Sequence, residues 1–71
     1  MTYGVLPERI KSARQRAGLS QSEIAREIGL NQSSISDWER GETVPNVTNL
    51  ARLARILGVT VDYLLDDTEA A

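Results

Sequence analysis

Apolar residues recur along this chain at the three- and four-residue spacing of amphipathic helices, and no alternating run is long enough to predict a strand. A glycine follows each of the first four helical stretches, where a left-handed residue commonly ends a helix. The pattern therefore predicts an all-α fold of five short helices. We expect one domain over residues 1–71, with a frayed end at 67–71 and helices at about 7–17, 21–28, 32–40, 47–57 and from Thr60 onward.

The helix starts carry their own signals. Pro7 stands in the first turn of the first helix, where its missing N–H costs nothing. Ser20 and Glu23 have the spacing of a capping box, in which each side chain satisfies a backbone N–H of the other residue. Asn31 is the expected side-chain cap of the third helix. Pro45 blocks continuation of that helix, so we expect a loop over 42–46.

The apolar side chains of each helix fall on one face, which predicts a shared core. The small side chain of Ala25 permits close approach of the second and third helices, and Gly29 supplies the positive φ of a tight turn. Trp38 could stack on bases, but its spacing from Ile35 favours the core. The positions expected to face inward are Ile10, Ala13, Ala17, Ile24, Ala25, Ile28, Leu30, Ile35, Trp38, Leu50, Leu53, Ala54, Leu57, Val61, Leu64 and Leu65.

The amino-acid composition excludes several kinds of chemical site. The chain has no Cys and no His, which excludes disulfides, Cys/His zinc sites, thiol nucleophiles and imidazole bases. We therefore expect no enzyme, no cofactor, no metal and no small-molecule ligand. The start lacks the pattern of a signal peptide, and no apolar stretch approaches the roughly 20 residues that span a bilayer, so a cytoplasmic protein without a membrane partner is expected.

The net charge of −2 argues at first against a nucleic-acid partner. The distribution of charged residues along the chain weakens that argument. Eight basic and six acidic residues lie at or before Arg55, while four acidic and no basic residues follow it. The body of the chain is thus mildly basic, and the acidic end is most simply a solvated terminus.

Residues 21–40 predict a helix-turn-helix, since two helices joined by so short a turn must cross steeply. With Ile35 and Trp38 turned inward, the opposite face of the third helix is polar and almost free of bulky side chains. That face carries Gln32, Ser33, Ser36, Asp37 and Arg40.

The stretch LSQSEIAREIGLNQSSISDWERGETVP, followed by LARLARILGVTVDYLL, resembles the phage-repressor and Cro class, the XRE-type helix-turn-helix family. The resemblance covers about residues 10–65. It implies a lambda-repressor-like fold and a bacterial or phage-encoded, nucleoid-associated transcription regulator, most often a repressor. The positions that fall at the family's spacing are Gln21, Ala25, Gly29, Ile35, Glu39, Gly41 and Pro45.

In that family the first residue of the second helix and the first turn of the third approach base edges, which implies base reading by Gln21, Gln32 and Ser33. Gln can bond adenine N6 and N7 together, so Gln32 is the expected main reader. Ser36 and Asp37, on the same face of the third helix, are further candidates for base reading. Asp37 either accepts from a cytosine amine or repels wrong sequences; alternatively, it pairs with Arg40 outside the interface.

Phosphate contacts are expected from Ser20, Thr43 and Asn46, with Arg14 and Arg40 as further donors. Glu42 departs from the family, many of whose members carry Lys or Arg in this loop, and it weakens the case for strong binding at high salt. Arg14 and Glu39 each lie beside an inward-facing position, and a buried charge without a partner is very costly. We therefore expect an ion pair between them, as the resemblance also implies.

One recognition helix covers only a few base pairs, so such domains usually bind as two-fold dimers to half-sites about 34 Å apart. The expected partners are a palindromic double-stranded operator and a second copy of the chain, in a homodimer that is weak without DNA. The alternative is an antitoxin-like or coactivator-like module of the same fold that binds a protein, which the acidic balance favours. The polar face of the third helix and Gln21 favour DNA.

Overall fold

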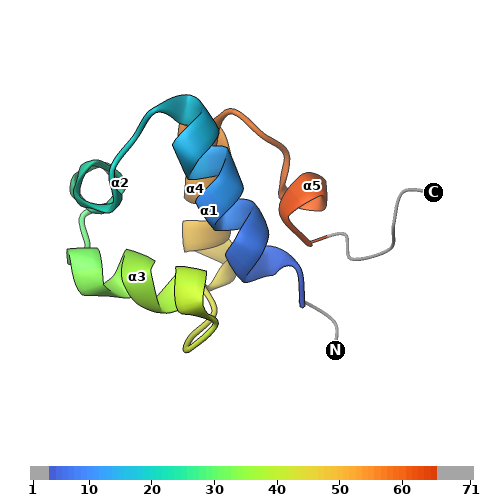
Figure 1. The fold of residues 1–71 in the computed structure, drawn as a ribbon, viewed down its shortest axis with the longest axis horizontal. Helices are drawn as coiled ribbons and strands as arrows, with labels where there is room; N and C mark the ends of the chain where they lie inside the picture. The colour runs from blue at the N-terminus through green and yellow to red at the C-terminus, as the bar shows by residue number, and fades with distance from the viewer. Residues whose placement is uncertain (1–3, 66–71) are drawn as a thin grey trace.

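A computed structural model describes residues 4–65 of the chain. It contains five helices over that range, as the sequence predicts (Figure 1). Their bounds are Leu6–Ala17 for α1, Gln21–Ile28 for α2, Gln32–Arg40 for α3, Val47–Leu57 for α4 and Val61–Leu65 for α5. The expected fraying at 67–71 lies outside the described residues.

The ends of α2 and α3 show which start and stop signals work. The Ser20–Glu23 capping box forms in both directions, and Gly29 ends α2 with φ +84°. The prediction that the Asn31 side chain caps α3 is wrong. The N–H of Ser34, one of the donors that such a cap could satisfy, donates instead to the backbone carbonyl of Asn31 at 3.0 Å.

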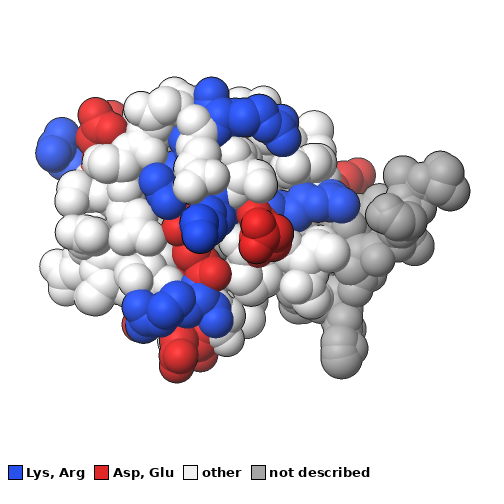
Figure 2. All heavy atoms as spheres, viewed as in Figure 1, with Lys and Arg blue, Asp and Glu red and all other residues white. Residues whose placement is uncertain are grey.

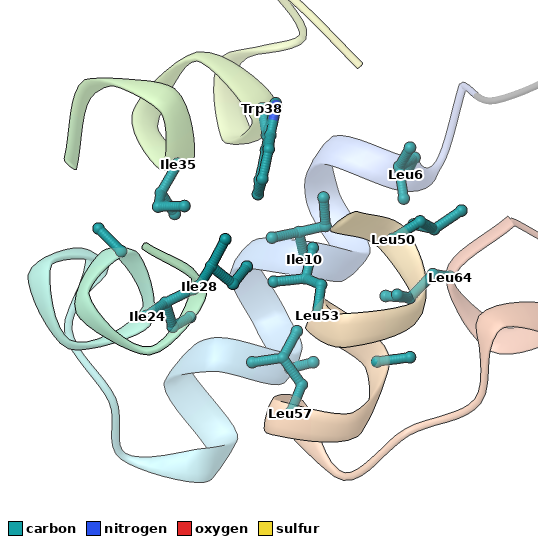
Figure 3. Close-up of a cluster of buried hydrophobic side chains, with 13 residues drawn as sticks. Leu6, Ile10, Ile24, Ile28, Ile35, Trp38, Leu50, Leu53, Leu57 and Leu64 are labelled. Atoms are coloured by element: carbon teal, nitrogen blue, oxygen red, sulfur yellow. The ribbon is translucent and has the colours of Figure 1, made fainter. Parts of the chain in front are cut away.

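All five helices contribute to one apolar core (Figure 3). Ile10 of α1, Ile24 of α2, Ile35 of α3, Leu53 of α4 and Leu64 of α5 have no exposed surface. Trp38 is also buried, which confirms that it belongs to the core. Burial of apolar surface is the main stabilising contribution available to so small a domain.

Two inward-facing assignments, Ala17 and Leu30, are wrong, and one buried residue, Leu6, is missing from the predicted set. Leu6 is buried although the sequence places the start of α1 at Pro7. Ala17 is exposed because it is the last residue of α1, where the chain turns away at Gly18. Leu30 is 37% exposed. Its backbone N–H donates to the Ala25 carbonyl and closes the α2–α3 turn, which leaves its side chain at the surface.

The helices are arranged so that α3 has one free long face. Figure 1 shows α2 nearly end-on while α3 lies across the view, so the two axes cross steeply. Helices α1 and α2 pack on the inner side of α3. On the other side of α1, Arg9 lies 4.6 Å over the Tyr63 ring of α5. Within residues 4–65, every helix is too short and too polar to traverse a bilayer.

Candidate nucleic-acid interface

The outward face of α3 presents polar side chains along its whole length. Gln32 and Ser33 in the first turn are exposed, Ser36 and Asp37 are partly buried, and Arg40 in the last turn is exposed. Ile35 and Trp38 hold the opposite face in the core and so fix which side chains point outward. The described residues enclose no pocket.

Gln32 is part of a chain of hydrogen bonds across α2 and α3. Its Nε2 donates to Gln21 Oε1 at 3.2 Å, and Gln21 Nε2 donates to Glu39 Oε1 at 3.0 Å. Ser22 Oγ donates to Gln32 Oε1 at 3.1 Å. We call Gln32, Gln21, Ser22 and Glu39 the amide relay.

The amide relay is anchored by an ion pair between α1 and α3. Arg14 Nε lies 2.6 Å from Glu39 Oε2, and Arg14 Nη2 donates to Glu39 Oε1 at 3.0 Å. The two side chains are only 14% and 5% exposed. The hydrogen bond with Glu39 raises the pKa of the Arg14 guanidinium, against the opposing effect of burial. Arg14 Nη1 also donates to the Leu19 carbonyl, so this pair, expected from the sequence, is present and well satisfied.

A second polar group occupies the last turns of α3. Arg40 Nη2 lies 2.6 Å from Asp37 Oδ1, and Arg40 Nη1 donates to Ser36 Oγ at 2.7 Å. The Arg40 and Asp37 side chains are 57% and 37% exposed. The structure therefore contains the Asp37–Arg40 pair that the sequence leaves as one alternative, and it adds Ser36 to that pair.

The remaining candidates for phosphate contact lie at helix starts and in the loop. Ser20 Oγ accepts from the Glu23 N–H at 3.0 Å, and Asn46 Oδ1 accepts from the Asn49 N–H at 2.8 Å. The Asn46 cap uses the carbonyl oxygen of its side chain, which leaves the amide nitrogen as the group that could donate to a phosphate. Thr43 is exposed in the loop.

The sequence alone did not point to Ser22 or to the contact between Gln21 and Gln32. The available signal was the position of all three at the starts of two crossing helices, next to a short turn. In Figure 2 acidic and basic side chains are interspersed over the visible face, and the surface over the first half of α3 is uncharged. Recognition by this surface would therefore rely on hydrogen bonds more than on a basic field.

Comparison with known proteins places this geometry in a family. The helix-turn-helix family model HTH_3 matches residues 10–64, which include all four members of the amide relay and Arg14. The chain belongs to this XRE-type helix-turn-helix family.

Three relatives show the range of the family. Repressor protein C2 of Salmonella phage P22 is 37% identical over 65 residues, covering 92% of this chain and 30% of that protein. A crystal structure of the P22 c2 repressor with a synthetic operator has a TM-score of 0.82 at 36% identity, covering 89% of this chain and 96% of that one. SinR in complex with DNA has a TM-score of 0.79 at 35% identity, covering 86% and 98%.

A further curated relative is named as a bridging factor. Multiprotein-bridging factor 1 of Candida albicans is 42% identical over 50 residues, covering 70% of this chain and 33% of that protein. The chain spans between about a third and a half of the length of the first curated relatives it matches.

Proposed function

We propose that this chain is a sequence-specific DNA-binding transcription regulator, most simply a non-enzymatic cytoplasmic repressor associated with the bacterial nucleoid, that inserts α3 into the major groove. The observation that carries this proposal is the polarity of the amide relay. The P22 c2 repressor and SinR structures, both solved with DNA at more than a third identity, support the same role.

The polarity follows from the Glu39 end of the relay, where Arg14 is bound. Arg14 can only donate and ionised Glu39 can only accept, so the Gln21 amide must turn its NH₂ toward Glu39 and its oxygen toward Gln32. The Gln32 NH₂ then faces Gln21, and its oxygen accepts from Ser22. One N–H and one lone pair of the Gln32 amide remain for a base.

Adenine matches this pair of groups. Its major-groove edge offers the N7 acceptor beside the N6 amine, which a glutamine amide can bond in both directions. Ser33, exposed in the same turn, can donate or accept at a neighbouring base, and Gln21 lies close enough to share in the contact. Ser36 and Asp37 are one turn further along the base-facing side.

Phosphate contacts would set the register of α3 in the groove. Arg14 has five N–H groups, of which three are used by Glu39 and Leu19, so two remain for a phosphate at the rim of its partly buried site. Ser20, Arg40, Thr43 and Asn46 would complete the set around α3. With one recognition helix per chain, two copies on a palindromic operator are needed for useful selectivity.

The test is a selection of bound sequences from a random DNA pool, followed by binding measurements on the selected duplex. We expect a palindrome with half-sites about one helical turn apart. Gln32→Ala should remove about 1–3 kcal/mol of preference at one adenine position. Gln15→Ala, which removes an exposed glutamine from α1, is the matched control and should change nothing.

A second candidate is a protein-interaction module of the same fold, favoured by the match to a bridging factor. Absence of DNA binding at about 50 mM salt, where phosphate contacts are strong, would count for that module. A uniform loss of affinity in Gln32→Ala across all sequences would count against base reading.

A further inference from the structure

The group formed by Ser36, Asp37 and Arg40 has a fixed polarity of its own. A guanidinium has donors only, so the Ser36 hydroxyl and Asp37 Oδ1 both act as acceptors toward Arg40. The Ser36 hydroxyl hydrogen is then left to donate elsewhere, and Asp37 Oδ2 keeps its lone pairs. Both side chains are only partly buried, and they lie on the outward side of α3, one turn after Gln32 and Ser33.

A carboxylate oxygen on this face needs an N–H donor in the groove. Guanine and thymine present carbonyl oxygens there and would be repelled, whereas cytosine and adenine each present an amine. Beside its amine adenine also carries the N7 acceptor, which repels a carboxylate, and cytosine has no such acceptor. Cytosine N4 is therefore the best matched partner for Asp37 Oδ2.

Arg40 removes the main objection to an acidic base reader. An unpaired carboxylate among phosphates would cost affinity with every sequence, but Asp37 and Arg40 together are neutral. The same contact at Oδ1 aims the second oxygen, because the carboxylate is planar. Arg40 thus neutralises and orients Asp37 without touching the base.

We propose that Asp37 selects cytosine at one position of the half-site and that Arg40 is the positioning residue for this contact. The proposal rests on the proposed function and deepens it, because it names a second base and the residue pair that reads it.

The experiment uses the duplex selected by the unchanged protein and measures dissociation constants by fluorescence anisotropy. Each base pair of the half-site is replaced in turn. We expect one position at which the protein prefers cytosine by about 5- to 150-fold, and Asp37→Ala should lose that preference while keeping the adenine preference assigned to Gln32. A duplex with 2-pyrimidinone, which lacks the N4 amine, at that position should weaken the unchanged protein but not Asp37→Ala.

Arg40 is tested through the same ratio. Arg40→Met should reduce the cytosine preference and leave the adenine preference unchanged, and Arg40→Lys should restore part of it. Circular dichroism checks that each variant folds.

Two results would overturn the proposal. The first is that Asp37→Ala keeps the cytosine preference. The second is that Asp37→Ala binds all duplexes more tightly by the same factor, which is expected if Asp37 only repels DNA or if its pair with Arg40 lies outside the interface. If the unchanged protein shows neither the cytosine nor the adenine preference, the proposed function itself is overturned.

Discussion

Two arginines pair with carboxylates on α3, and the two pairs differ in almost everything except distance. Arg14–Glu39 and Arg40–Asp37 both have a shortest contact of 2.6 Å. The first joins two helices and is 14% and 5% exposed, whereas the second joins residues three apart on one helix and is 57% and 37% exposed. Distance alone therefore says little about what an ion pair contributes.

The two pairs differ in what happens to each carboxylate when its arginine is removed. If Glu39 were left alone, its carboxylate would be buried without a counter-ion, which costs several kcal/mol. If Asp37 were left alone, water would solvate it, so an exposed pair contributes about 0–1 kcal/mol. The inner pair holds α3 against α1 and anchors the amide relay. The outer pair is free to serve recognition at little cost to the fold.

Arg14→Met is the largest expected effect and the most direct way to break this comparison. It should lower the free energy of unfolding by about 3–5 kcal/mol, because Glu39 loses its counter-ion in a nearly buried site. The matched control, Arg40→Met, should lower it by about 1 kcal/mol or less. Chemical denaturation of both variants measures the difference. Equal losses, or an unchanged Arg14→Met, would refute the assignment of stability to the inner pair.

Removing both inner partners sharpens the comparison. Arg14→Met combined with Glu39→Leu leaves no buried charge, and replacing a buried pair by apolar side chains is often neutral or stabilising. We expect the double variant to regain most of the stability that Arg14→Met loses. The same denaturation experiment gives the coupling between the two sites. If the double variant is less stable than Arg14→Met alone, the cost arises from packing and not from the isolated carboxylate.

Much of the fold was predictable because its signals are local. Gly18, Gly29 and Gly41 stand where helices end, and the predicted bounds of α2, α3 and α4 are those observed. The inner ion pair was also foreseeable, since Arg14 and Glu39 each sit beside a buried position in a helical pattern. Leu30 was misplaced because its side chain depends on how the turn closes and not on periodicity.

The amide relay could not be predicted from the sequence, for a physical reason. Whether Gln21 meets Gln32 depends on the crossing of α2 and α3 and on two flexible side chains, so a shift of an ångström would replace the bond by water. The spacing of residues along each helix has no information on that scale. Spacing along α3 does place Asp37 within reach of Arg40, but it does not determine whether the second oxygen of the carboxylate also meets a base.

The contrast between polar groups that have a partner and those that lack one extends to the helix starts. Ser20 Oγ accepts a hydrogen bond from the Glu23 N–H, whereas the Asn31 side chain makes no such bond at the start of α3. Ser20→Ala should therefore cost about 1 kcal/mol of stability, and Asn31→Ala much less. Thermal melts of the two variants test this. A larger loss in Asn31→Ala would mean that its side chain caps α3 after all.

The smallest expected effect concerns pH and the exposed partner in the capping box. The hydrogen bond from the Ser20 N–H, at 2.8 Å, lowers the pKa of Glu23 below its ordinary value of about 4.5. A carboxyl group whose pKa is lowered by folding stabilises the folded state at pH values above that ordinary value, and this contribution is lost as the pH falls through the lowered pKa.

Glu23→Gln keeps a side chain that can accept the same bond but removes the charge from the start of α2. Its melting temperature should be slightly below that of the unchanged protein at pH 7, and the gap should narrow as the pH falls below about 4.5 and through the lowered pKa of Glu23. Because both proteins share every other carboxylate, the narrowing of the gap isolates Glu23. A gap of constant size across this range would show that the charge does not contribute and that the hydrogen bond alone makes the cap.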